Sequence, residues 1–464
     1  MDALHRLSAA DALRLMRARE LSPVELVEAV IRRAEQVEPA INAFPHTYYD
    51  EALAAARGAE ARYAGNGPRP RPLEGIPVAI KDETPILGQP LTQASLIYKD
   101  DVATHTAVVP ERVMRAGGIV HARSATPEFS SAAFTHSRIY GITRNPWNTE
   151  YSPGGSTGGG AASLAAGSAM LATGSDIGGS VRIPATFSGV VGFKPPYGRV
   201  PVEPPYNLDH FCHDGPLART VADCALLENV LAGPHHSDPV ALRPKLRIPA
   251  ELGGIEGWRI AYSLDLGYEV GPDVEAGVLA AVEGLREAGA TLEEVEVGWT
   301  HHDVTAATRA HFAAMFGGSV VEALRAHRDL MTAYTVQFGE ESAEVTMADY
   351  VDGMKIEARI HAALGRIHRR HRALIGPGFG VAQLRAGDDC LDVDTYAMLL
   401  TAVFNVCSRS PVLSVPSGRS GEGVPTGIQI AARPYDDVSA FRIGAALERV
   451  RPWPQIAELA LVAV

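Results

Sequence analysis

The sequence predicts an α/β fold, because strand-like and helix-like segments alternate along much of the chain. Residues 259–262 and 292–297 have the pattern of short strands, with a helix expected between them at 272–287. Two further strands are expected at 411–416 and 426–430, followed by a C-terminal helix. The chain has 464 residues, 46% of them hydrophobic and 21% charged, so it has ample material for a large core.

The N-terminal part supplies the first elements. Residues 8–44 predict a pair of helices, the second beginning at Ser22 with proline in the first helical position and a capping box to Glu25. The next elements expected are a helix at 51–63, a buried strand at 78–80, a helix at 110–116 and a strand at 118–122.

Two glycine-flanked serines stand out in residues 152–194. Ser156 lies in GGSTGGG and Ser180 in DIGGS, and the small residues at 161–172 between them predict a closely packed helix running into a strand. Glycine lets a backbone turn tightly and lets N–H groups converge on an anion, which suits a reactive serine with an oxyanion hole. One alternative is a nucleotide-binding loop, but the segment has neither the Lys-Ser/Thr ending of a phosphate-binding loop nor the G-x-G-x-x-G motif. The other alternative is that the glycines serve packing and the serines cap helices.

Lys81 stands at the end of the strand predicted at 78–80. Of the 42 basic residues only five are lysine, so the chain uses arginine wherever a positive charge is enough. Arginine cannot be deprotonated, whereas a desolvated lysine can become a base, which makes Lys81 a candidate for catalysis. The structural alternative is a lysine that reaches the surface or pairs with Asp82 or Glu83.

Composition excludes several classes of function. The formal charge of −12 gives no support for a nucleic-acid or anionic-membrane partner. The four cysteines have no C-x-x-C spacing, so neither a disulfide framework nor a zinc site is suggested. The first twenty residues contain no hydrophobic signal core and no later run approaches a membrane span, so we expect a cytoplasmic protein.

Histidines offer two further alternatives. Asp209, His210 and His213 could supply a Ser-His-Asp triad, but nothing in their spacing ties them to Ser180. The segment from His368 to 371 lacks the glutamate of a zinc-protease helix and offers only two ligands, so a solvated helix face is preferred and no metal or cofactor is expected.

Residues 176–184, Asp-Ile-Gly-Gly-Ser-Val-Arg-Ile-Pro, closely resemble the D-[TI]-G-G-S-[IV]-R-[IF]-P segment of the amidase signature family of serine hydrolases. The Gly-Gly-Ser at 154–156 matches that family's upstream loop with the family's spacing, and residues 75–82 resemble its G-[IV]-P-x-x-[IV]-K-D motif. The resemblance covers nearly the whole chain and is weakest between 300 and 400.

The resemblance implies a single α/β/α domain over residues 1–464, with a large twisted mixed sheet covered by helices on both faces. Within it, N-terminal helices would occupy residues 1–65 and the signature core about 73–233. A variable, mostly helical substrate region is expected at about 300–400.

The resemblance also implies the roles of the site residues. Ser180 would be the nucleophile, Ser156 the proton relay after a cis peptide bond from Gly155, and Lys81 a neutral base. The backbone N–H groups of Ile177, Gly178, Gly179 and Ser180 would form the oxyanion hole. Asp176, Arg182 and Thr157 would brace the turns, Thr157 through its hydroxyl.

These features predict a hydrolase that cleaves a C–N acyl bond of a small molecule, an amide and also a carbamate (urethane) or ester, as a monomer or homodimer. Selectivity is expected from residues 85–140 and 300–410, with Phe129, Trp147 and Phe404 as candidate pocket walls. The alternatives are a glutaminase-type amidotransferase component that needs partner chains, and a non-catalytic binding homologue.

Overall fold

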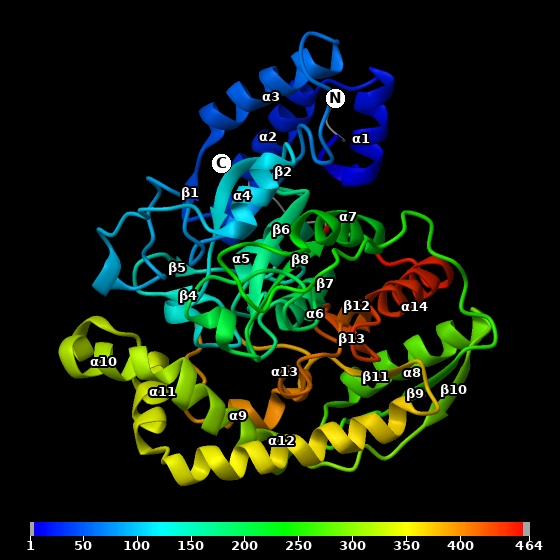
Figure 1. Cartoon of the computed structure of the whole chain (residues 1–464). Helices are drawn as coiled ribbons and strands as arrows, with labels where there is room; N and C mark the ends of the chain where they lie inside the picture. Colours follow the sequence, from blue (N-terminus) through cyan, green and yellow to red (C-terminus); the bar gives the residue numbers. More distant parts are fainter. Residues whose placement is uncertain (1–3, 458–464) are drawn as a thin grey trace.

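A computed structural model describes residues 4–457, and one mixed sheet of eleven strands runs through them (Figure 1). Strands β3, β2 and β6 pair in parallel at one end and β11, β9 and β10 at the other, while the strands between them are antiparallel. In order across the sheet the strands are β1 (His46–Thr47), β3 (Ile119–Ser124), β2 (Pro77–Lys81), β6 (Leu171–Asp176), β8 (His213–Ala218), β7 (Val191–Lys194), β12 (Val412–Arg419), β13 (Pro425–Ala432), β11 (Ala373–Pro377), β9 (Arg259–Tyr262) and β10 (Thr291–Glu294). Strands β4 (His136–Ser137) and β5 (Gly141–Ile142) form a separate small pair.

Helices cover both faces of this sheet, as predicted. One face packs against α1 (Ala9–Ala18), α4 (Val108–Arg115), α7 (Val221–Leu231), α8 (Pro272–Glu287) and α14 (Asp437–Val450). The other packs against α5 (Gly158–Ala166), α6 (Arg182–Ser188), α9 (His301–Met315), α12 (Met347–His368) and α13 (Val403–Val406). The remaining helices are α2 (Pro23–Ile41) and α3 (Tyr49–Tyr63) beside the β1–β3 edge, and α10 (Gly317–His327) and α11 (Ala333–Glu344) against α9.

Residue alternation along the strands explains the two layers. On β2, Val78 and Ile80 join the core on the α1 face, whereas Ala79 joins the core that contains α5. The small residues of α5 allow a close approach, since a Cβ at Gly159 would lie 2.3 Å from the backbone nitrogen of Ala125. The predicted closely packed helix followed by a strand is therefore confirmed as α5 and β6.

Two predicted elements differ from the structure. Residues 300–400 are mostly helical, but β11 (Ala373–Pro377) lies within them and is the link between β13 and β9. The strand predicted at 292–297 is β10, which ends at Glu294 after pairing with β9. The helices predicted at 272–287 and near the C-terminus are confirmed as α8 and α14.

Within residues 4–457, no helix is long and apolar enough to cross a membrane. All four cysteines are free and buried.

Candidate active site

Lys81 is the last residue of β2, and its fully buried side chain points at two serines. Its Nζ donates hydrogen bonds to Ser156 Oγ at 2.7 Å and to Ser175 Oγ at 2.8 Å. The same Nζ lies 3.0 Å from Glu83 Oε1, so the ion pair expected as the structural alternative coexists with the serine contact. The lysine is therefore held between a hydroxyl that could pass it a proton and a carboxylate that stabilises its ammonium form.

Glu83 is fixed in turn by hydroxyl groups. Ser130 Oγ donates a hydrogen bond to Glu83 Oε2. Burial tends to raise the pKa of Glu83, but Lys81 and the hydrogen bonds from Ser130 and Ser175 hold it below its usual range. Nearby on β8, burial raises the pKa of Asp214 to about 7, and the charge of Glu83 adds to that rise.

The Ser156 loop and the Ser180 turn are joined through backbone. The Gly155–Ser156 peptide bond is cis. A side chain at Gly155 has no room, because its Cβ would lie 2.3 Å from the carbonyl oxygen of Phe134. The amide of Thr157 donates to the carbonyl of Ser180 at 3.1 Å, which ties the two loops together.

The hydroxyl of Thr157 does not act as predicted. Its Oγ1 is buried without a hydrogen-bond partner, so Thr157 links the turns through its amide instead. The side chain packs over Gly174 of β6, where a Cβ would lie 2.3 Å from Thr157 Oγ1.

A buried ion pair closes the turn that carries Ser180. Arg182 contacts Asp176 through Nη2 and Nε, at 2.8 and 3.0 Å. Asn405 bonds to both partners, and Gln429 accepts from Arg182 at 2.6 Å. Burial would raise the pKa of Asp176, but Arg182 and Asn405 hold it well below its usual range. The turn thus carries a permanent, compensated charge pair beneath it.

Ser180 lies at the floor of a cavity of about 410 Å³. Ile177, Gly178 and Gly155 line the same floor, so three of the residues expected around the nucleophile meet there. Gly179, in the same turn, has φ of 127°, and a Cβ there would lie 2.1 Å from Thr401 Oγ1. Only glycine fits this turn without moving Thr401.

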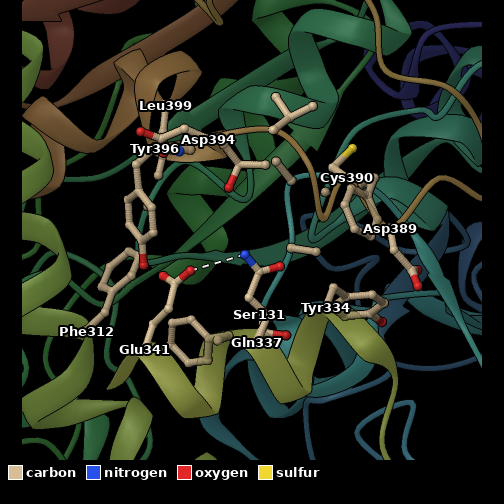
Figure 2. A pocket seen from close by; sticks show the side chains of 18 of the residues that line it. Ser131, Phe312, Tyr334, Gln337, Glu341, Asp389, Cys390, Asp394, Tyr396 and Leu399 are labelled. Carbon is tan, nitrogen blue, oxygen red and sulfur yellow. Dashed lines mark hydrogen bonds between the residues drawn. The ribbon is translucent and has the colours of Figure 1, made fainter. Parts of the chain in front are cut away.

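The cavity walls come from four segments separated in the sequence (Figure 2). Residues 130–134 form one side, helices α9 and α11 a second, and residues 389–399 a third. Aromatic and acidic side chains both contribute to the walls; the aromatic lining residues are Phe134, Phe312, Phe316, Tyr334, Phe338 and Tyr396, and the acidic ones are Glu341, Asp389, Asp392 and Asp394. These segments fall within the ranges predicted to set selectivity.

The cationic side chain of Arg309 on the cavity wall already has an ionic partner. Arg309 pairs with Glu341 at 3.1 Å and lies over the ring of Tyr396 at 5.4 Å. Gln337 donates to Glu341 at 3.2 Å, as Figure 2 shows. Among the described residues of this wall, Arg309 is the one cationic side chain.

The three aromatic residues predicted as pocket walls do not line this cavity. Phe404 is fully buried in the core on α13. Phe129 points into the same core, edge-on to Tyr98. Trp147 donates from Nε1 to the Ser188 carbonyl and lines a separate hollow. These predictions are wrong because the type and position of an aromatic residue in the sequence do not show whether it faces a cavity or the core. Lining residues such as Phe312 on α9 and Tyr334 and Phe338 on α11 lie on helix faces that helical spacing can group, but the spacing does not tell what such a face lines.

The histidine alternatives are not supported by the contacts. Both ring nitrogens of His213 face backbone carbonyls, and burial, with Lys194 nearby, lowers its pKa to about 3. His368 and His371 are buried rather than solvated: they bond separately to the Ala431 carbonyl and to Glu293. The prediction of a solvated helix face there is wrong, because His368 at the end of α12 and His371 just beyond it contact residues of strands β13 and β10.

Comparison with known proteins gives the family. The family model described as Amidase matches residues 25–440. The chain belongs to the amidase signature family. It is 35% identical to one of the glutamyl-tRNA(Gln) amidotransferase subunits of Chloroflexus aggregans, over 98% of each chain, and 32% identical to an acylamidase of Rhodococcus erythropolis, over 97% and 96%. A solved bacterial aryl acylamidase of this family superposes with a TM-score of 0.91 at 28% identity, covering 99% of each chain.

This amidase-family enzyme is thus a hydrolase of C–N bonds with the predicted α/β fold. Its relatives carry two kinds of name, acylamidase and amidotransferase, so the family alone leaves the substrate open.

Proposed function

We propose that the chain is a stand-alone amidase that cleaves small-molecule amides through an acyl-enzyme on Ser180. The observation that carries the proposal is the hydrogen bond of 2.7 Å between Lys81 Nζ and Ser156 Oγ, beside a cavity whose floor contains Ser180. A buried lysine next to a serine hydroxyl is an arrangement for proton transfer.

In this mechanism Ser180 Oγ attacks the carbonyl carbon while Ser156 takes its proton and passes one to Lys81. The amides of Ile177, Gly178, Gly179 and Ser180 stabilise the oxyanion, a kind of contribution worth about 3 kcal/mol per donor. Ser156 then returns a proton to the leaving nitrogen, because an amine leaves poorly unless it is protonated. Water finally hydrolyses the acyl-enzyme.

The aromatic walls favour a substrate with an apolar or aryl group beside the scissile bond. Carbamates and esters of the same shape should also react, because the attack and the oxyanion are the same. An amidotransferase role is favoured by the 35% identity to the Chloroflexus aggregans protein. Against it, the described residues that line the cavity include one cation, Arg309, which pairs with Glu341, and four carboxylates, those of Glu341, Asp389, Asp392 and Asp394, so the formal negative charge disfavours the carboxylate of glutamine.

Intact-mass analysis after incubation with a fluorophosphonate tests the proposal, on the wild type and on Ser180→Ala. A single adduct that is lost in the variant, with turnover of an anilide, ester or carbamate by the isolated chain, would support it. Turnover of glutamine alone would favour the amidotransferase role. If a well-folded chain shows neither adduct nor turnover, the non-catalytic homologue is favoured.

A further inference from the structure

A second cluster of chemistry-bearing side chains lies outside the catalytic site, between the segment before β8 and two helices. Asp209 and His210 belong to that segment, His311 lies on α9 and Glu357 on α12. A ligand atom from each of Asp209, His210 and His311 lies within 4.8 Å of the others. Glu357 closes the group, since its carboxylate lies 3.2 Å from His210 Nε2 and 3.9 Å from His311 Nδ1.

The cluster contains two buried carboxylates, those of Asp209 and Glu357. Asp209 is 1% exposed and Glu357 8%. Across residues 4–457 no lysine or arginine forms an ion pair with either one; their ionic partners are His210 and His311. A buried carboxylate is costly unless a nearby positive charge compensates it or it takes up a proton. The positive charge available to this cluster is a protonated histidine or a bound cation.

Two buried atoms in the cluster have no hydrogen-bond partner. They are Asp209 Oδ2 and His311 Nδ1. The other nitrogen of His311, Nε2, lies 2.6 Å from Asp209 Oδ1, so the ring donates there. Its Nδ1 is then left with a lone pair that faces the carboxylate of Glu357 across 3.9 Å, which is too far for a hydrogen bond.

We propose that this cluster binds a divalent transition metal of the zinc class, with His210 Nε2, His311 Nδ1 and Glu357 as direct ligands. Two ligands of a tetrahedral zinc ion lie about 3.3 Å apart, because each is about 2.0–2.1 Å from the metal. Glu357 Oε2 lies 3.2 Å from His210 Nε2, which matches that value, and Glu357 Oε1 lies 3.9 Å from His311 Nδ1, which is somewhat longer. Two imidazoles and a carboxylate are donors that suit zinc.

Asp209 is the positioning residue of this site. It accepts the N–H of the metal-binding ring, which fixes the tautomer of His311 and its orientation, as carboxylates behind ligating histidines do. Phe211 stacks on one face of the His311 ring, with the ring centroids 3.6 Å apart, and also holds the ring in place. The side chain of His210 is 34% exposed, so a metal ion can enter from that side.

The metal would join three parts of the chain that are distant in sequence. It would also anchor α9 next to the cavity, because Phe312 follows His311 and lines the catalytic pocket. The role is structural, and it does not depend on which substrate the enzyme cleaves.

The test is zinc content and zinc binding of the full chain. Protein treated with a chelator is titrated with Zn²⁺ by calorimetry, and with Co²⁺ while the visible absorption bands of tetrahedral cobalt are recorded. We expect one metal per chain and a rise in the Tm with Zn²⁺. Asp209→Asn should weaken the affinity by about 10–100-fold. His210→Ala removes a ligand that is partly exposed and should weaken it by at least about 10-fold.

His302→Ala is the matched control, because His302 lies exposed on the same helix as His311. It should keep the affinity and the Tm response of the wild type. The proposal is overturned if the wild type binds no stoichiometric metal and gives no tetrahedral cobalt spectrum, or if His210→Ala binds like the wild type. The first result would mean that protons on the cluster's own side chains balance its charge, and the second that the metal binds at another site.

Discussion

Replacing Glu83 by glutamine tests the protonation requirement that the proposed mechanism places on Lys81. Lys81 can accept a proton only as the neutral amine, and Glu83 Oε1 lies 3.0 Å from its Nζ. Glutamine keeps the size of the side chain and an acceptor for Ser130 but removes the negative charge. The neutral amine then forms more easily, so the acidic limb of the pH profile should move to lower pH.

The size of this shift follows from the geometry. Two unit charges 3.0 Å apart attract by about 5–6 kcal/mol at an effective dielectric constant of about 20. Water offsets part of this, since the side chain of Glu83 is 23% exposed. Close opposite charges usually move a protonation equilibrium by about 1–3 pH units, or about 1.4–4 kcal/mol. We therefore expect the acidic limb of kcat/KM to shift down by about 1–3 pH units in Glu83→Gln.

The assay is kcat/KM from about pH 5 to about pH 10 on an amide without titratable groups. Asp214 could produce an acidic limb of its own, because burial raises its pKa to about 7. The Asp214→Asn variant therefore serves as a control. A limb that belongs to Asp214 disappears in Asp214→Asn, whereas a limb that belongs to the Lys81–Glu83 pair persists there. A folded Glu83→Gln enzyme whose acidic limb stays in place, or moves to higher pH, would refute the reasoning.

Four further predictions concern the residues around the nucleophile. Ser156→Ala should lower kcat/KM by about 10²–10⁴-fold because it removes the proton relay. In urea titrations the variant should stay folded, with a free energy of unfolding lowered by about 1–3 kcal/mol, because buried Lys81 loses one hydrogen-bond partner. Arg182→Met should lower the free energy of unfolding by about 3–5 kcal/mol in urea titrations, since the carboxylate of Asp176 loses its partner. The pKa of Asp176 is lower in the folded protein than its value of about 3.9 in the unfolded chain, so the ionised carboxylate stabilises the fold above that pH. This contribution to the free energy of unfolding should be lost as the pH falls below about 3.9, which urea titrations at acidic pH measure. Gly155→Ala should lower the Tm and the activity together, because the new Cβ would lie 2.3 Å from the Phe134 carbonyl; an unchanged Tm would contradict this close packing.

Lys81, Ser156 and Ser180 could be proposed from the sequence because they lie in short motifs that resemble those of the amidase signature family, and their catalytic roles stay predictions. Lys81 ends a buried strand, and Ser156 and Ser180 each lie in a glycine-rich turn next to β6. Glycine permits the positive φ that the two turns adopt at Gly154 and Gly179, and the hydrogen bond from the Thr157 amide to the Ser180 carbonyl joins them. The contact between Lys81 and Ser156 follows from the pairing of β2 with β6.

The cavity walls could not be predicted in the same way. Phe312, Tyr334 and Tyr396 converge from three separate segments, and which helix face turns inward depends on how α9 and α11 pack. Phe404 and Trp147 are just as aromatic but are held by the core and by the Ser188 carbonyl. Composition does not distinguish the two situations.

Strand β11 could not be predicted for a related physical reason. All five of its residues are buried, so the strand lacks the alternation that marks a half-exposed one. It also follows soon after α12, a helix of 22 residues, so the sequence around it predicts a helical region. Only its pairing with β13 and β9 identifies it as a strand.

The proposed function makes a prediction about the charge of the cavity wall. The described residues that line the cavity include one cation, Arg309, which pairs with Glu341 at 3.1 Å. The same lining contains four carboxylates, those of Glu341, Asp389, Asp392 and Asp394, so its formal charge is negative and a substrate carboxylate would be repelled. The proposed amidase role therefore predicts that an uncharged aryl amide, which avoids this repulsion and packs against the aromatic side chains, binds more tightly than glutamine.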